Sequence, residues 1–144
     1  MACASAASAT PHPRSATPGR DRSLSAHLPW IGARTCGPDG AHVRFLSGVA
    51  NPVALKVGPG TDPDRPARLS ALLDPDRQPG RPVLISRMGA ERVRAALPPL
   101  VERVASPGHP VEWVCDPVHG NTYTAVGGHK TRHVAKAVRE LFGR

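Results

Sequence analysis

The feature that most constrains the fold of this chain is a pattern that occurs three times: a short apolar run, a loop and a helical segment. The three runs are 53–57, 82–86 and 110–115, and each is continuously apolar rather than alternating with polar residues. Such runs are typical of strands that are buried on both faces, as in parallel sheets joined by helices. The sequence therefore predicts an α/β fold built on a parallel sheet.

The segments between the runs have helical patterns. We predict helices near 66–73, over about 90–104 and over about 131–142, with a short helix over 40–48 ahead of the first run. Pro98-Pro99 predicts that the second of these helices is kinked or divided in two. Residues 116–128 are predicted to be a loop, and the stretch after Pro29 is at best an irregular or edge strand.

The first 23 residues differ in composition from the remainder of the chain. They are rich in Ala, Ser, Thr, Pro and Arg, and Asp21 is their first acidic residue. A segment of this kind buries too little apolar surface to offset the entropy lost on ordering, so we expect a disordered leader over 1–23. Organelle transit peptides share this composition, but the interpretation that we favour is an upstream stretch without a folded role. We therefore expect a cytoplasmic protein, with a plastid-type organelle as the alternative if the leader directs transport.

Charge and composition exclude several classes of protein. The chain has 19 Lys+Arg against 11 Asp+Glu, a net charge of +8, but the basic residues are scattered and aromatic residues make up 3%. Nucleic-acid surfaces cluster their basic residues and often add stacking aromatics, so we expect no nucleic-acid partner. No apolar run approaches the roughly 18–20 residues of a membrane span, so we expect no membrane partner. Three cysteines are too few and odd in number for a disulfide framework, which indicates a reducing compartment.

Cationic side chains follow or end the apolar segments. Lys56 lies near the end of the first run, Arg87 directly follows the second, and Arg34 follows the segment Trp-Ile-Gly. In parallel β/α folds the carboxyl ends of the strands share one face, where the chemistry takes place. Three cations on one rim would bind an anion such as phosphate or carboxylate. The alternative is that all three are solvated surface charges.

The segment Cys-Asp-Pro-Val-His-Gly-Asn-Thr, residues 115–122, follows the third run and holds Asp116 and His119. The imidazole of His119 is suited to metal binding or acid–base catalysis, and Asp116 to orienting it. No second metal ligand occurs at a characteristic spacing. A loop histidine without a ligand is therefore the alternative interpretation.

Eight sequence blocks in family order resemble the type II (plant-like) 3-deoxy-D-arabino-heptulosonate 7-phosphate (DAHP) synthases, over about 24–144. They are WIGART (30–35), DGAHV (39–43), NPVALKVGP (51–59), PGR (79–81), LISRMGA (84–90), LPPLVERV (97–104), WVCDPVHGNT (113–122) and GHKTR (128–132). The resemblance implies a (β/α)8 barrel that condenses phosphoenolpyruvate with erythrose 4-phosphate, using a divalent metal such as Mn²⁺. This reaction opens the shikimate pathway to chorismate and the aromatic amino acids.

Carried over by motif, the resemblance implies a role for each matching residue. Arg34, Lys56 and Arg87 would bind phosphoenolpyruvate, and Lys56 and His119 would be catalytic, with His119 also a metal ligand. Lys130 and Arg132 would be substrate-binding residues, and together with Asn51-Pro52 they resemble second-substrate or supporting positions.

The chain departs from the family pattern at several places. Ala33 stands where the family usually has Glu, Cys36 where it has Arg, and Val118 where it has Met. The other metal ligands of the family, a Cys, a Glu and an Asp, have no counterpart in this sequence. We therefore expect the chain to contain substrate-binding residues but an incomplete set of metal ligands.

The chain has 144 residues, whereas a (β/α)8 barrel typically needs about 250. We therefore expect a partial barrel domain over 24–144, with about three β/α units and an irregular lead-in, and a truncated DAHP synthase. The alternative is a non-catalytic phosphate-binding fragment or interaction module derived from the family. Either a homo-oligomer or docking on a full-length paralogue is expected as its assembly.

Overall fold

The computed structural model describes residues 20–22 and 25–142 of the chain. The predicted leader over 1–23 lies outside the described residues except for 20–22, where Asp21 forms an isolated parallel bridge with Val49. No helix in the described ranges is long and apolar enough to cross a membrane.

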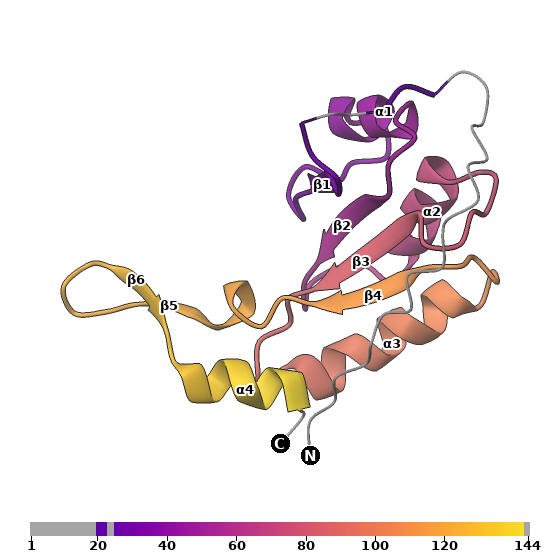
Figure 1. Cartoon of the computed structure of the whole chain (residues 1–144). Helices are drawn as coiled ribbons and strands as arrows, with labels where there is room; N and C mark the ends of the chain where they lie inside the picture. Colours follow the sequence, from indigo (N-terminus) through magenta and orange to yellow (C-terminus); the bar gives the residue numbers. More distant parts are fainter. Residues whose placement is uncertain (1–19, 23–24, 143–144) are drawn as a thin grey trace, which may run out of the picture.

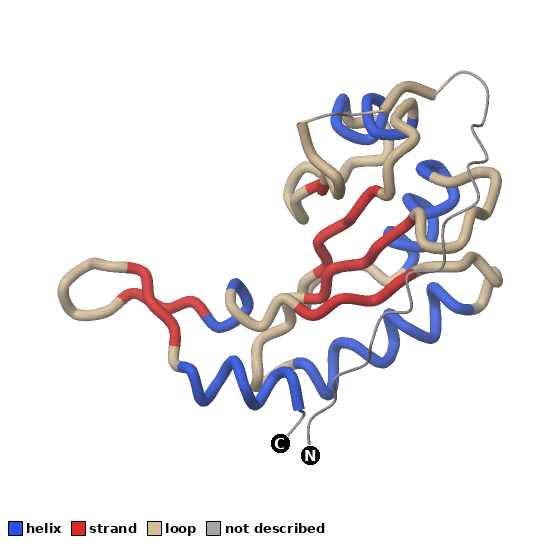
Figure 2. The backbone as a smooth tube through the Cα atoms, viewed as in Figure 1, coloured by secondary structure: helices blue, strands red, loops and turns tan. Residues whose placement is uncertain are grey.

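The core of the fold is a four-stranded parallel sheet whose strands lie in chain order (Figure 1). The strands are β1 (Trp30–Ile31), β2 (Val53–Val57), β3 (Pro82–Ser86) and β4 (Glu112–Cys115). The helices between them are α1 (Ala41–Ser47), α2 (Asp64–Leu73) and α3 (Val93–Ala105). Figure 2 shows the alternation of strand and helix along the backbone. The predicted α/β class and parallel sheet are confirmed, and β1 is the short edge strand that Pro29 suggested.

One face of the sheet packs against the helices. Val53, Leu55 and Val57 of β2 belong to one apolar core with Leu69 and Leu73 of α2. Leu84 of β3 and Leu100 and Val104 of α3 complete this layer. Because side chains alternate between the faces of a strand, Lys56 lies on the opposite face. That face is open at β4, where the Val114 side chain is 48% exposed.

The prolines of α3 do not divide the helix, contrary to one of the two predicted outcomes. Pro98 and Pro99 lie inside a continuous helix of 13 residues. Each proline removes one backbone donor, which would otherwise bond the carbonyl four residues earlier. Those carbonyls belong to Arg94 and Ala95, which are exposed, so water can replace the missing donors.

The segment after β4 is more ordered than the predicted loop over 116–128. It holds a 3-10 helix, η1 (His119–Asn121), and then a two-stranded antiparallel hairpin of β5 (Thr122–Thr124) and β6 (Lys130–Arg132). The last helix, α4 (Val134–Phe142), therefore begins three residues later than predicted, because 130–132 is strand. In Figure 1 the hairpin projects from the sheet, and α4 returns toward the start of α3.

Candidate functional site

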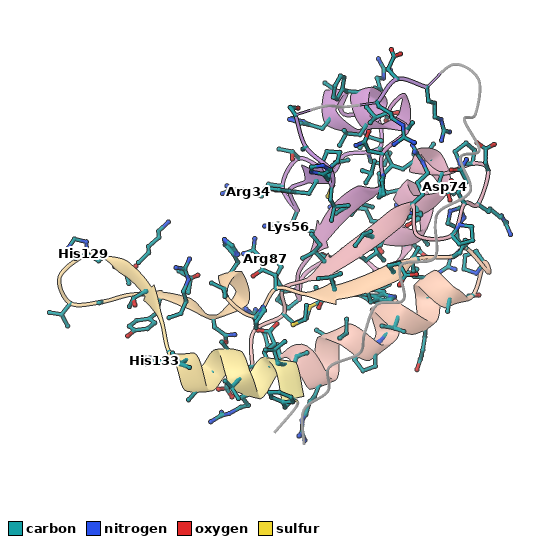
Figure 3. All side chains as sticks on the ribbon, in the orientation of Figure 1. Arg34, Lys56, Asp74, Arg87, His129 and His133 are labelled. Atoms are coloured by element: carbon teal, nitrogen blue, oxygen red, sulfur yellow. The ribbon has the colours of Figure 1, made fainter. Side chains whose placement is uncertain are left out.

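A cavity of about 720 Å³ lies at the carboxyl ends of the strands. Six of the residues that the sequence singled out line it: Arg34, Lys56, Arg87, His119, Lys130 and Arg132. They come from separate parts of the chain, which the parallel topology brings to one rim. Figure 3 shows the side chains of Arg34, Lys56 and Arg87 near one another at this end of the sheet.

The position of these side chains is set either by the end of a strand or by the β5–β6 hairpin. Lys56 is the fourth residue of β2, and Arg87 directly follows β3, where its N–H donates to the Val57 carbonyl at 2.9 Å. Lys130 and Arg132 are the first and last residues of β6. The hairpin thus adds two cations to those that the parallel sheet supplies.

Asp116 connects Lys56 with His119. Its backbone N–H donates to Ser86 at 2.7 Å, which extends the β3–β4 pairing by one residue. Its Oδ2 atom lies 2.6 Å from Nδ1 of His119 and 3.6 Å from Nζ of Lys56. With an ionised Asp116, the Nδ1 atom of His119 carries the proton of this hydrogen bond, so the Nε2 atom is the ring nitrogen that remains for chemistry.

Several contacts act on the ionisation of Asp116. Burial by itself would raise the pKa of this carboxyl, but the hydrogen bonds and positive charge of His119 and the Val118 N–H outweigh burial and lower the pKa. Oδ1 accepts the backbone N–H groups of Val118 and His119, each at 3.2 Å. Asp116 therefore remains an anion and a hydrogen-bond acceptor at neutral pH.

Trp30 supports Lys56 from the neighbouring strand. Nζ of Lys56 lies 5.4 Å from the centroid of the Trp30 ring, within the range of a cation–π contact. Trp30 pairs with Ala54 across β1 and β2, which places the ring beside Lys56. The lysine thus has an aromatic contact and a carboxylate contact that together limit its conformations.

The turn that carries Arg34 is held by local hydrogen bonds. The Thr35 N–H donates to Gly32 at 3.0 Å, and the Cys36 thiol donates to the Ala33 carbonyl at 3.0 Å. Cys36 is buried and is a free thiol. Ala33 lines the cavity and brings no carboxylate to it.

Two cations of the cavity were not singled out from the sequence: Arg65 and Arg92. Arg65 lies in the first turn of α2, and Arg92 is the residue before α3. Both are arginines at the beginning of a helix that follows a strand, and this position was the signal that could have identified them. With them, seven cationic side chains line the cavity.

Asn51 lies elsewhere, ahead of β2 at the opposite end of the strand. Its Nδ2 atom donates to Ala26 at 3.1 Å and to His27 at 3.4 Å. It therefore anchors the lead-in segment to the start of β2. The hairpin residue His129 projects away from the sheet in Figure 3.

The described residues do not form a metal centre. Within 20–22 and 25–142 there is no group of three or more His, Cys, Asp or Glu side chains that could hold a metal ion. His119 and Asp116 are one histidine and one carboxylate, and Asp116 is already bonded to His119. A catalytic metal commonly has three protein ligands, so the donors described here do not fit one.

The chain is similar in sequence to known proteins over most of its length. Residues 13–143 match the model of the Class-II DAHP synthetase family. The chain is 49% identical over 119 residues to phospho-2-dehydro-3-deoxyheptonate aldolase AroG of Mycolicibacterium smegmatis, which covers 83% of this chain and 26% of the relative. It is 45% identical over 125 residues to the phospho-2-dehydro-3-deoxyheptonate aldolase of Streptomyces coelicolor. This match covers 87% of the present chain and 28% of the relative.

A plant protein is similar at the same level. The chain is 50% identical over 116 residues to a Catharanthus roseus protein named "Probable phospho-2-dehydro-3-deoxyheptonate aldolase, chloroplastic", which covers 81% of this chain and 24% of the relative. The chain thus spans about a quarter of the length of these three relatives.

Proposed function

This chain belongs to the class-II DAHP synthetase family, and on that premise we propose that its cavity binds the two phosphorylated substrates of DAHP synthesis, phosphoenolpyruvate and erythrose 4-phosphate. One observation carries the proposal: six residues chosen from strand-end positions and family motifs line a single cavity. The activity proposed is that of 3-deoxy-7-phosphoheptulonate synthase, an aldol-type transferase.

Phosphoenolpyruvate carries a phosphate and a carboxylate, and Arg34, Lys56 and Arg87 are the cations proposed to bind it. A guanidinium group binds either anion through two parallel hydrogen bonds, and the lysine adds a point charge. Trp30 and Asp116 both contact the Lys56 ammonium. Lys130 and Arg132 of the hairpin are proposed to bind the phosphate of erythrose 4-phosphate, which would bring the aldehyde toward phosphoenolpyruvate.

In the proposed reaction, C3 of phosphoenolpyruvate forms a carbon–carbon bond with the aldehyde carbon of erythrose 4-phosphate. Water adds at C2 of phosphoenolpyruvate, the bond from C2 to the phosphate oxygen breaks, and inorganic phosphate leaves. The aldehyde oxygen takes up the proton that the water gives up and becomes a hydroxyl group. Positive charge around the leaving phosphate stabilises the charge that develops on it. His119, with Nδ1 engaged by Asp116, is proposed to act through Nε2 as a proton-exchanging group.

The family resemblance also implies a divalent metal bound in part by His119. Because the described residues supply too few donors for a metal, no step of the reaction is assigned to one here. A metal at this cavity would need further ligands besides those of the described residues.

We further propose that the four strands correspond to part of a (β/α)8 barrel. Two features support this: the strands are parallel and in chain order, and the sheet face opposite the helices is open at Val114. Parallel sheets are normally covered on both faces. In a barrel, this face would be covered by the other strands of the ring.

An activity assay tests the proposed function. The purified chain is incubated with both substrates, with and without Mn²⁺, and the released phosphate and the seven-carbon product are measured. Formation of product supports the synthase. Binding of phosphoenolpyruvate without product supports the second candidate, a non-catalytic phosphate-binding module, which the missing metal donors and Ala33 favour. Absence of both binding and turnover contradicts both candidates.

A further inference from the structure

The helix α4 buries a carboxylate and exposes its apolar face. Glu140 is 4% exposed and is the buried residue of this helix. Val134, Val138 and Leu141 have exposed fractions of 78%, 46% and 52%. A buried carboxylate is unfavourable unless hydrogen bonds replace its water. The position of α4 therefore depends on what Glu140 contacts.

Glu140 accepts three hydrogen bonds, two of them from the loop that follows β3. Its Oε1 atom accepts the backbone N–H groups of Met88 at 2.9 Å and Gly89 at 3.0 Å. Its Oε2 atom accepts Nδ2 of Asn121 at 2.6 Å. Met88 directly follows Arg87, so the carboxylate is bonded to the backbone next to a cavity cation.

Asn121 carries the same network to the loop that follows β4. Its Oδ1 atom accepts the Ala90 N–H at 3.0 Å, and its Nδ2 atom also donates to the Pro117 carbonyl at 2.7 Å. Asn121 is 9% exposed and ends the 3-10 helix that begins at His119. One amide side chain therefore joins the Arg87 loop, the His119 loop and α4.

The two loops also touch through glycines. A Cβ atom on Gly120 would lie 2.6 Å from the Gly89 nitrogen, and one on Gly89 would lie 2.8 Å from the Gly120 oxygen. Backbone contact this close leaves little freedom between the loops. The relative position of Arg87 and His119 thus depends on this buried network rather than on the strands alone.

We propose that Glu140 and Asn121 are positioning residues that set the arrangement of Arg87 and His119 at the cavity. This inference rests on the proposed function, because it takes Arg87 and His119 to serve one anion-binding site. Neither Glu140 nor Asn121 lines the cavity of about 720 Å³. They act on it through the loops.

The variant Glu140→Gln tests the network with little change in side-chain volume. The new carbonyl can still accept from Met88 and Gly89, but the new NH₂ group faces the NH₂ group of Asn121. We expect phosphoenolpyruvate affinity to fall about tenfold, the effect of one charged hydrogen bond. The amide ¹⁵N–¹H resonances of Arg87 and His119 are expected to shift. Glu102→Gln, on an exposed position of α3, is the matched control and should change neither.

The double variant Glu140→Gln/Asn121→Asp exchanges the hydrogen-bond donor and acceptor between positions 140 and 121. The glutamine NH₂ then donates to the new aspartate, whose carboxylate also accepts the Ala90 N–H, while the hydrogen bond that Asn121 donates to the Pro117 carbonyl is lost. We therefore expect partial recovery of the lost affinity and a partial return of both resonances toward wild type. Recovery of this kind distinguishes positioning by this network from a general loss of packing.

The outcomes separate the inference from the proposed function. If the wild type does not bind phosphoenolpyruvate, the proposed function is wrong. The inference is then tested by the amide resonances of Arg87 and His119 alone, which must still shift in Glu140→Gln. If Glu140→Gln keeps wild-type affinity and resonances, or if the double variant recovers neither, the inference is wrong. If Glu140→Gln does not fold, the same readouts are applied to Asn121→Ser, and unchanged affinity and resonances there overturn the inference.

Discussion

The Oδ2 atom of Asp116 lies 2.6 Å from Nδ1 of His119. The two residues are three positions apart, at the end of β4 and at the start of the 3-10 helix. Because Asp116 also accepts the His119 backbone N–H through Oδ1, the histidine is held at its ring and at its backbone. This contact is local in sequence, yet Asp116 also approaches Lys56 from β2, so it links two strand ends of the cavity.

The variant Asp116→Asn is expected to lower stability in a pH-dependent way. The folded-state pKa of Asp116 lies below the unfolded value of 3.8, so its stabilisation is present above that value and is lost as pH falls through the folded pKa. We expect the variant to lose about 1–3 kcal/mol in the free energy of unfolding at pH 7. The difference between variant and wild type should become smaller toward pH 3. Urea denaturation at both pH values measures it. The exposed Asp39→Asn is the control, and an equal loss at both pH values would contradict the account.

Trp30→Leu is expected to weaken substrate binding without unfolding the chain. The ring is 61% exposed and contacts the Lys56 ammonium. A cation–π contact at an exposed site contributes about 0.5–1 kcal/mol, so phosphoenolpyruvate affinity should fall about two- to fivefold. Isothermal titration calorimetry measures this change. Phe45→Leu, at an exposed position of α1 with a 69% exposed side chain, should leave affinity unchanged. Equal effects of the two substitutions would argue against the contact.

Gly120→Ala is expected to separate the Arg87 and His119 loops. The added Cβ would lie 2.6 Å from the Gly89 nitrogen and 3.1 Å from the Arg87 carbonyl carbon. Both are backbone atoms, so one loop must move, and overpacking of this kind costs about 1–3 kcal/mol. Thermal unfolding should show the loss, and titration should show weaker phosphoenolpyruvate binding. A Cβ on Gly37 meets nothing within 4 Å, so Gly37→Ala is the control. Wild-type behaviour of Gly120→Ala would rule out the tight contact.

Arg81→Met is expected to destabilise the end of the sheet away from the cavity. Arg81 is 4% exposed, and it donates to the carbonyls of Leu73, Asn51 and Val49 at 3.0, 3.1 and 2.6 Å. Its guanidinium also faces the buried Asp74, with Nε 3.8 Å from Oδ1. Removing one partner of a buried pair costs about 3–5 kcal/mol. The melting temperature measures this loss, with the exposed Arg44→Met as control. A melting temperature like that of the control would refute this role.

The strands could be predicted from the sequence because buried strands of a parallel sheet consist of continuous apolar runs. The structure has β2 and β3 at the predicted positions, and the cations at their ends line one cavity. That convergence follows from parallel topology, in which all strands end on one side. The cationic character of this end of the sheet could therefore be predicted from the sequence alone.

The hairpin was not predicted because its strands have no apolar alternation. All three residues of β5 are exposed, and β6 also lacks a buried residue. The available signal was Gly127-Gly128 between two short runs that contain Thr and Tyr, with Gly128 at φ 79°. A turn at these glycines explains how Lys130 and Arg132 reach the cavity.

The network of Glu140 and Asn121 could not be predicted from periodicity. The pattern of α4 places Val134, Val138 and Leu141 on one face and suggests that this face is buried, whereas the structure buries Glu140. Two of the three partners of Glu140 lie about fifty residues earlier in the chain, at Met88 and Gly89. Only the tertiary arrangement brings them together.

The central claim is that the cations at the strand ends form one anion-binding site, and calorimetric titration with phosphoenolpyruvate tests it most directly. The wild type is compared with Arg34→Ala, Arg87→Ala and the exposed control Arg44→Ala. The account predicts saturable binding that inorganic phosphate competes with, a loss of about tenfold or more for Arg34→Ala and Arg87→Ala, and wild-type affinity for Arg44→Ala. No binding by the folded wild type, or equal affinities for all three variants, would contradict it.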